Sequence, residues 1–107
     1  NYQASDVNQV GKELDNNSLP KNIMVDASHA NSQKDHTKQK LVIEDIAKQI
    51  KLGNKSICGV MLESNLVEGR QDISDKTKLV YGKSITDACI GWDETVKLIN
   101  LLNSALK

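Results

Sequence analysis

The chain has 107 residues, and its 14 Lys and Arg residues balance 14 Asp and Glu residues, so it carries no net charge at neutral pH. A protein without net charge has no long-range attraction for polyanions, and we therefore expect neither nucleic acid nor an anionic membrane as a partner. Leu, Ile and Val make up about a quarter of the chain, which is above the range of disordered sequences. Hydrophobic residues are only 38% and aromatic residues 3% of the total, which predicts a core that is small for a solitary domain.

The apolar runs are too short for a membrane-spanning helix. The longest, Ile57 to Leu62, is far below the roughly 20 residues that such a helix needs, and we see no basic and apolar leader. Cys58 and Cys89 lack the spacing of a CxxC pair or of a disulfide-rich framework, which favours reduced thiols. We therefore expect a cytoplasmic protein.

The first part of the chain predicts a helix followed by a strand. From Ser5 onward, apolar residues recur at helical spacing, and Pro20 prevents the helix from continuing. These apolar residues are Val7, Val10 and Leu14. Lys21 to Asp26 then places three consecutive apolar residues between a proline and a polar stretch, which is typical of a strand that is buried on both faces.

A second helix and a second strand follow after a loop. Asp35 can cap a helix with His36 as an exposed residue, and Gly53 ends this helix. Its apolar positions fall at i, i+3, i+4 and i+7, at Ile43, Ile46, Ala47 and Ile50. Ile57 to Leu62 predicts another fully buried strand, because it is too short for a helix. The span from Ile23 to Leu62 is therefore expected to form a βαβ unit.

The rest of the chain predicts a long loop and a final helix. Ser64 to Gly91 shows no sustained periodicity, and a loop of this length in a compact domain is usually functional. We expect such a loop here, with room for a short helical turn. After Gly91 and Asp93, apolar residues again mark one face of a helix, at Leu98, Leu101, Leu102 and Ala105.

The predicted order α-β-α-β-α is that of an α/β fold that is incomplete on its own. Two parallel strands form too short a ladder and bury too little area to stand alone. The missing strands must come from the rest of a larger α/β domain or from further copies of the chain. A (β/α)8 barrel has eight such strands in about 250 residues, so this chain would be roughly its last quarter.

Three side chains with metal-binding chemistry fall where the predicted strands end. His29 lies three residues past the first strand, Glu63 immediately follows the second, and Asp87 lies in the long loop before the last helix. Active-site groups of parallel α/β folds gather at this edge of the sheet. An imidazole and two carboxylates can bind a divalent cation such as Mn, Fe, Co or Zn, so we expect His29, Glu63 and Asp87 to form a metal site.

Each of these residues also has a simpler interpretation. A lone loop histidine is more often a surface or hydrogen-bonded residue than a ligand. Glu63 can be solvated at a strand end, and Asp87 can cap a turn. Spacing alone leaves these alternatives open. Gly69 to Gln71 could line an anionic site, although a solvated turn is the simpler interpretation.

Three ordered blocks of residues carry a resemblance to a known family. They are Asp26 to Ser32, then Gly59 to Ser64 with Leu66 to Gly69, and finally Tyr81 to Cys89. Together they resemble the type I 3-deoxy-D-arabino-heptulosonate 7-phosphate (DAHP) synthase family, and the match runs through nearly the whole chain.

The resemblance implies a metal-dependent transferase, a DAHP synthase, on a (β/α)8 TIM barrel. Such an enzyme joins phosphoenolpyruvate to erythrose 4-phosphate in an aldol-type condensation, the first step of the shikimate pathway to aromatic amino acids. By motif, His29, Glu63 and Asp87 correspond to three of the family's four metal ligands and thus to catalytic residues. The fourth ligand is a cysteine near the first barrel strand, and neither Cys58 nor Cys89 lies in the matching motif.

By this resemblance, residues 1–107 are one C-terminal fragment of the single barrel domain, with its last helix-strand-helix-strand-helix units. Most basic residues that hold the substrate phosphates come from earlier strands, so we expect the chain alone to be inactive. We expect it to form a homo-oligomer or to associate with the missing upstream part of the barrel. The alternative is a non-catalytic, oligomerising α/β fragment that lacks the substrate-binding half.

Overall fold

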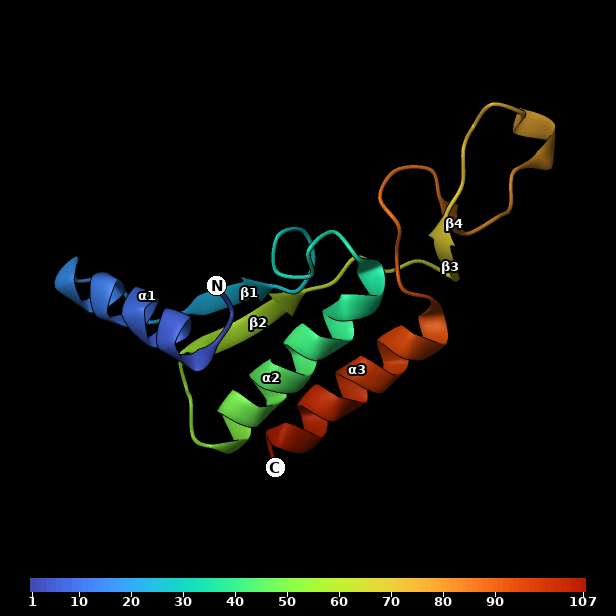
Figure 1. Ribbon diagram of the computed structural model, residues 1–107. Helices are drawn as coiled ribbons and strands as arrows, with labels where there is room; N and C mark the ends of the chain where they lie inside the picture. The colour runs from blue at the N-terminus through green and yellow to red at the C-terminus, as the bar shows by residue number, and fades with distance from the viewer.

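Two short parallel strands form the centre of the molecule. The computed structural model describes residues 1–107 (Figure 1). Strand β1 (Ile23–Asp26) pairs in parallel with β2 (Ile57–Met61), and Asp26 lies opposite Met61. Helix α2 (Gln39–Lys51) connects the two strands, because a parallel pair needs a long crossover. The predicted βαβ unit is therefore confirmed.

Helices α2 and α3 (Trp92–Ala105) lie side by side and cover one face of this strand pair (Figure 1). Ile43 and Ile46 of α2 are completely buried, since their spacing places both on the face that packs inward. A short 3₁₀ helix, η1 (His36–Lys38), precedes α2, so Asp35 caps a 3₁₀ turn and not the α-helix itself. The buried core consists of Val25, Ala27, Val42, Ile43, Ile46, Ile90 and Leu98.

Helix α1 (Ala4–Asn16) packs beside the strand pair (Figure 1). It ends well before Pro20, as the sequence predicts, and Val7 is its buried apolar residue. None of the three α-helices combines the length and the hydrophobicity that crossing a bilayer requires.

Residues 65–86 form an arm that extends from the body of the molecule (Figure 1). The arm contains β3 (Val67–Arg70), the 3₁₀ turn η2 (Lys76–Lys78) and β4 (Lys83–Ser84), and its two strands pair in parallel. The helical turn was expected, but the strands correct the prediction of a loop without regular structure. The two strands are so short that no periodic pattern in the sequence reveals them.

Both central strands are buried on one face only, which corrects the prediction that each is buried on both. Met24 is 67% exposed and Cys58 is also exposed, because no further element covers the second face. The radius of gyration, 16.1 Å, exceeds the roughly 13 Å expected of a compact domain of this length. The chain thus has the small core and the open sheet of an incomplete α/β unit.

Candidate metal site

The loop after β1 holds His29 in an unusual backbone conformation. Its φ angle is 50°, in the left-handed region that residues other than glycine seldom adopt. The side chain of Asn31 donates to the Asp26 carbonyl at 2.7 Å, and the Lys34 N–H donates to the His29 carbonyl at 2.9 Å. Such conformations persist where the surroundings fix them, and they cluster at functional sites.

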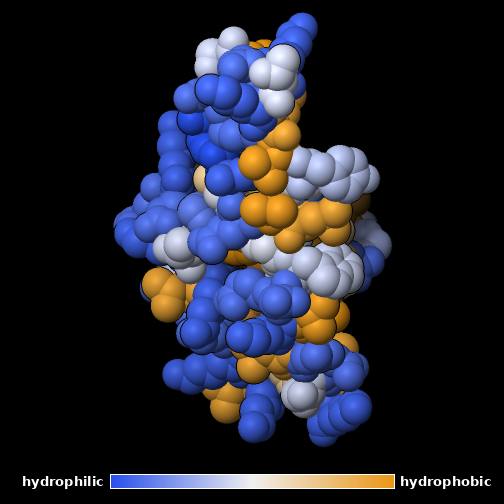
Figure 2. Space-filling view, turned by 90° about the vertical axis from the view of Figure 1, so that its right-hand side faces the viewer, coloured by the Kyte–Doolittle hydropathy of each residue, from blue (hydrophilic) through white to orange (hydrophobic).

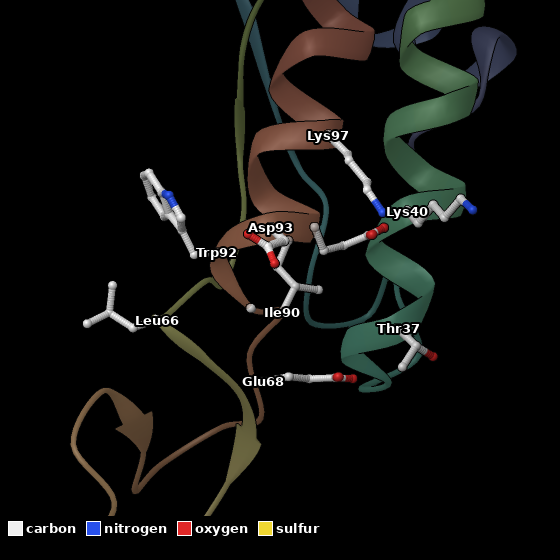
Figure 3. A pocket seen from close by; sticks show the side chains of 10 residues that line it. Thr37, Lys40, Leu66, Glu68, Ile90, Trp92, Asp93 and Lys97 are labelled. Atoms are coloured by element: carbon white, nitrogen blue, oxygen red, sulfur yellow. The ribbon is translucent and has the colours of Figure 1, made fainter.

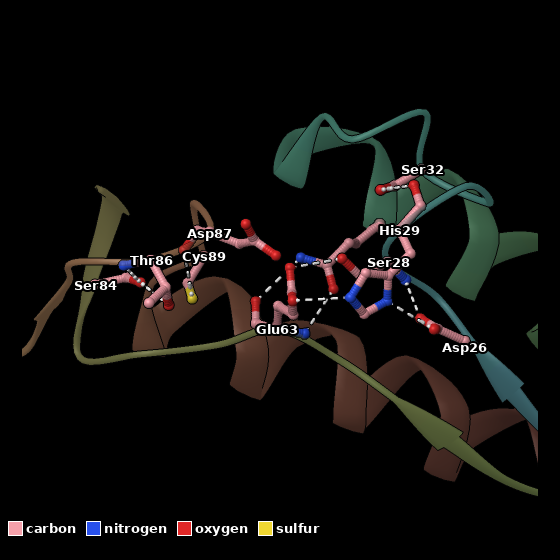
Figure 4. Close-up of polar contacts among 10 residues, drawn as sticks. Asp26, Ser28, His29, Ser32, Glu63, Ser84, Thr86, Asp87 and Cys89 are labelled. Carbon is pink, nitrogen blue, oxygen red and sulfur yellow. Dashed lines mark hydrogen bonds and ion pairs between the residues drawn. The ribbon is translucent and has the colours of Figure 1, made fainter. Parts of the chain in front are cut away.

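The imidazole of His29 lies between two carboxylates (Figure 4). Its Nδ1 is 2.8 Å from Oδ2 of Asp26, and its Nε2 is 3.3 Å from Oε1 of Glu63. The hydrogen bond with Asp26 and the Asp26 charge raise the pKa of His29 above its ordinary value of 6.5, and the charges of Glu63 and Asp87 add to this effect. Because Asp26 engages Nδ1, Nε2 is the nitrogen that faces the other candidate ligands.

Glu63 lies just beyond β2, and its carboxylate is held from two sides (Figure 4). The Ser28 hydroxyl donates to Oε2 at 2.7 Å, while Oε1 faces His29. The side chain is 22% exposed, so it is partly withdrawn from water but still reaches the surface. The loop after β1 thus fixes a carboxylate that comes from the loop after β2.

Asp87 approaches from the base of the arm, three residues after β4. The chain then returns to the end of β2, where the Ile90 N–H donates to the Glu63 carbonyl at 3.1 Å and the Asn65 N–H donates to the Ile90 carbonyl at 3.0 Å. This backbone pairing brings Asp87 next to Glu63, although the two residues belong to different segments.

The structure brings all three residues singled out in the sequence together. One ligand atom each from His29, Glu63 and Asp87 lies within 4.8 Å of the others. One imidazole nitrogen and two carboxylate oxygens are a donor set that fits Mn, Fe, Co or Zn. A cavity of about 340 Å³ surrounds them, with Lys34 and His36 also in its wall. The arrangement can therefore hold a divalent cation that stays open to further ligands.

The cysteines do not join this cluster. Cys58 is exposed on β2, and the Cys89 thiol donates to the Asp87 carbonyl at 3.5 Å. Burial raises the pKa of the Cys89 thiol, and the nearby carboxylates of Glu63 and Asp87 raise it further, against a hydrogen bond with Ser84. Cys89 is thus a neutral thiol and not a thiolate at neutral pH.

Sequence reasoning missed the supporting residues Asp26 and Ser28. Both lie at the end of β1 beside His29, and the spacing of three residues between Asp26 and His29 was the available signal. The prediction of His36 as an exposed helical residue is wrong. Its ring is partly buried, with Nε2 2.9 Å from Oε1 of Glu68, because β3 approaches the start of α2.

Arg70 lies in the segment considered for anion binding, but its side chain contacts other residues of the arm. Its guanidinium contacts the Asp72 carboxylate and the Thr86 carbonyl, each at 3.0 Å. Arg70 is not in the wall of the cavity around His29. These contacts brace the two ends of the arm against each other.

A larger cavity of about 590 Å³ lies at the start of α3 (Figure 3). Lys40 and Lys97 line it together with Glu68, Asp93 and Glu94, and none of the three candidate ligands does. Charges of both signs share this wall, and the three candidate ligands lie in the smaller cavity.

Comparison with known proteins identifies relatives along the whole chain. The sequence model described as the DAHP synthetase I family matches residues 1–100. The chain is 50% identical over 107 residues to a Phe-sensitive phospho-2-dehydro-3-deoxyheptonate aldolase of Escherichia coli, covering 100% of this chain and 31% of that protein. It is 48% identical over 106 residues to a phospho-2-dehydro-3-deoxyheptonate aldolase of Haemophilus influenzae, covering 99% of this chain and 29% of that protein.

A solved structure gives the same result in three dimensions. The phospho-2-dehydro-3-deoxyheptonate aldolase of Francisella tularensis superposes with a TM-score of 0.93 at 45% identity, covering 99% of this chain and 30% of that one. The chain thus spans about 30% of the length of the relatives it matches. The agreement of sequence, structure and family model shows that the chain belongs to the DAHP synthetase I family.

Proposed function

We propose that this chain supplies three metal ligands of a 3-deoxy-7-phosphoheptulonate synthase. The observation that carries the proposal is the approach of His29, Glu63 and Asp87 to within 4.8 Å of one another from three separate segments. Family membership supports the same conclusion, because the relatives are named as phospho-2-dehydro-3-deoxyheptonate aldolases. The complete enzyme would condense phosphoenolpyruvate with erythrose 4-phosphate.

The proposed barrel accounts for the exposed face of the strand pair. In this proposal, the chain is the C-terminal part of a (β/α)8 barrel, and further strands cover the face that carries Met24. A two-stranded parallel sheet with one bare face is what remains when such a barrel lacks its other strands. The share of about 30% of the relatives' length is consistent with a chain that contributes two barrel strands.

Within this site, a divalent cation would act as a Lewis acid toward the aldehyde of erythrose 4-phosphate. His29 would bind through Nε2 while Asp26 keeps the proton on Nδ1. Glu63 and Asp87 would add anionic oxygens, and the Ser28 hydroxyl would orient the Glu63 carboxylate. The chain's own residues thus define which atoms face the cation.

Lys34 extends the proposal to substrate binding. It lines the same cavity as the three ligands, and both proposed substrates are phosphorylated anions that a cationic side chain attracts. One lysine cannot hold two such substrates in reacting distance, so further basic residues must come from the rest of the enzyme. We therefore propose that the chain alone is inactive.

The proposal is tested by titrating the full-length protein that carries this chain with Mn²⁺ in a calorimeter. We expect His29→Ala and Glu63→Ala each to raise the dissociation constant of Mn²⁺ by more than about 100-fold. The reason is that changes in the outer shell alone cost 10- to 100-fold, and these changes remove a ligand.

Two matched variants serve as controls. His36→Ala removes the other histidine of the same cavity, and Glu44→Ala removes an exposed glutamate of α2. Both should leave Mn²⁺ affinity within a few-fold of the wild type. Equal affinity in folded His29→Ala and His36→Ala proteins would refute the proposed site.

A further inference from the structure

Gln39, the first residue of α2, is completely buried and makes a two-point contact with the backbone of Glu63. Its Oε1 accepts from the Glu63 N–H at 2.8 Å, and its Nε2 donates to the Glu63 carbonyl at 3.0 Å. The two residues are separated by 24 positions along the chain. Because a carboxamide carries the donor and the acceptor of a peptide group, Gln39 pairs with Glu63 as a neighbouring strand would.

Glu63 needs such a partner because the strand ladder ends before it. The last pair between β1 and β2 joins Asp26 to Met61, and the Ala27 N–H donates to the Met61 carbonyl. Beyond that point, the Glu63 N–H has Gln39 as its acceptor. An unpaired N–H at a partly buried position costs free energy, so this contact fixes where the backbone of Glu63 lies.

Glu63 also contacts the segments that carry the other two candidate ligands. The Glu63 carbonyl accepts from Gln39 and also from the Ile90 N–H, which follows Asp87 by three residues. The Glu63 carboxylate in turn accepts from Ser28, which precedes His29. Glu63 is thus the residue that contacts the segments of both other candidate ligands, and Gln39 holds its backbone from the side of the helix.

We propose that Gln39 is a positioning residue of the metal site. Through the backbone of Glu63, it keeps the Glu63 carboxylate at coordinating distance from His29 and Asp87 without touching the cation. This inference deepens the proposed function and rests on it. A carboxylate that moves by even part of an ångström loses favourable coordination, and residues that orient metal ligands typically contribute 10- to 100-fold to metal affinity.

The test compares two glutamines of the same helix in the full-length protein. Gln39→Met keeps the length of the side chain and removes both contacts with Glu63. Gln49→Met is the matched control, because Gln49 is also buried in α2 but bonds to the Tyr2 carbonyl and to Asp45, away from the site. Both variants should lose some thermal stability. Only Gln39→Met should raise the dissociation constant for Mn²⁺, by about tenfold or more.

Equal Mn²⁺ affinity in the two folded variants would overturn the positioning role. If Gln39→Met does not fold, Gln39→Asn and Gln49→Asn replace the pair. The shortened amide at residue 39 cannot reach both backbone groups, so weaker Mn²⁺ binding than in Gln49→Asn is again expected, and equal binding overturns the inference. Loss of Mn²⁺ binding in the wild type itself would instead overturn the proposed function, and the positioning role with it.

Discussion

The carboxylate of Asp26 organises the loop that carries His29. It accepts from the Ser28 N–H at 2.7 Å through one oxygen and contacts His29 Nδ1 at 2.8 Å through the other. One side chain therefore sets the turn of the backbone and the orientation of the imidazole. The raised pKa of His29 is the electrostatic consequence of this arrangement in the metal-free protein.

Asp26→Asn should lower the pKa of His29 toward its ordinary value of 6.5, because the hydrogen bond to a carboxylate and the carboxylate charge both disappear while the shape of the side chain is kept. An NMR titration of the His29 ring protons in metal-free protein measures this change. Asp72→Asn is the control, since Asp72 pairs with Arg70 on the arm. A pKa of His29 that is equal in the two variants would contradict the assigned cause.

The stability of the metal-free protein should follow the same pKa shift. A folded-state pKa above the unfolded value means that the Asp26 contact stabilises the fold fully below pH 6.5, and that this stabilisation is lost as the pH rises through the raised pKa. The wild type should therefore be more stable than Asp26→Asn at pH 5.5, with a smaller difference at pH 9, in chemical unfolding. A difference in stability between the two proteins that grows as the pH rises would contradict this prediction.

At the scale of elements, α2 shows why its periodic pattern was a reliable predictor. Ile43, Ile46 and Ala47 are buried as predicted, and Leu41 on the other side of the helix is 56% exposed.

Ile46→Ala should lower the free energy of unfolding by about 2–5 kcal/mol, because it leaves a cavity in the core. Leu41→Ala should change it by less than about 0.5 kcal/mol. Denaturant unfolding of both variants tests this contrast, and similar losses would contradict the packing described.

Gly82 is a position of the arm that has no room for a larger side chain. Its φ angle is +79°, and a Cβ placed there would lie 2.8 Å from the Cβ of Leu66. Gly53 also has a positive φ angle, +103°, but a Cβ there would meet nothing within 4 Å. Each Gly→Ala change should lower the free energy of unfolding by about 1–2 kcal/mol, because alanine is strained at a positive φ angle. Gly82→Ala should lower it further, because the new Cβ clashes with Leu66.

Hydrogen exchange measures this effect locally. The Val67 N–H donates to the Gly82 carbonyl at 2.9 Å, so its exchange reports the opening of the arm. It should exchange faster in Gly82→Ala and at the wild-type rate in Gly53→Ala. Equal rates in the two variants would show that a Cβ at residue 82 does not strain the arm against Leu66.

The whole molecule is elongated and leaves much apolar surface in water. Its extents are 54 × 29 × 19 Å, and only 16 of 107 residues are buried. Figure 2, which views the side from which the arm projects, shows apolar atoms exposed among hydrophilic ones. Large exposed apolar residues occur on the open strand face and on the arm, for example Met24, Leu66, Ile73, Val80 and Tyr81. Surfaces of this kind are usually covered by a partner.

The isolated chain should therefore associate. We expect light scattering to give a mass above the 11.8 kDa of the monomer, rising with concentration, since β1 and β2 also leave strand edges open. Met24→Lys should reduce this association, because a charge must be desolvated when the strand face is covered. A monomer that melts cooperatively at all concentrations would contradict this expectation.

Measurements of metal binding and of self-association together distinguish the two functions that the sequence suggests, a part of a synthase and a non-catalytic fragment. A non-catalytic, oligomerising fragment would associate through the open sheet but would bind Mn²⁺ no better than His29→Ala does. A part of a synthase would bind Mn²⁺ through His29 and Glu63 once the strand face is covered. This test concerns the whole molecule, because His29 and Glu63 follow the two strands whose second face is open.

The order of the main elements, the βαβ unit, the family resemblance and the three candidate ligands were all predictable from the amino-acid sequence. The elements follow from local signals, which are apolar periodicity and a proline or glycine at an element's end. The candidate ligands follow from polar residues at or beyond the predicted strand ends, and the resemblance from three blocks of sequence. The helix faces were predictable for the same reason, as Ile43 and Ile46 show.

The coverage of the strand faces, the pairing of β3 with β4, and the contacts of Asp26, Ser28 and Gln39 with the candidate ligands became visible only in three dimensions. Whether Met24 is buried or exposed depends on which other strands are present. The residues next to Met24 in the sequence carry no information about those strands. Gln39 contacts Glu63 across 24 residues, a distance that no periodic pattern encodes. Contacts between distant segments follow from how helices and strands pack, whereas local sequence patterns specify only whether a segment forms a helix or a strand.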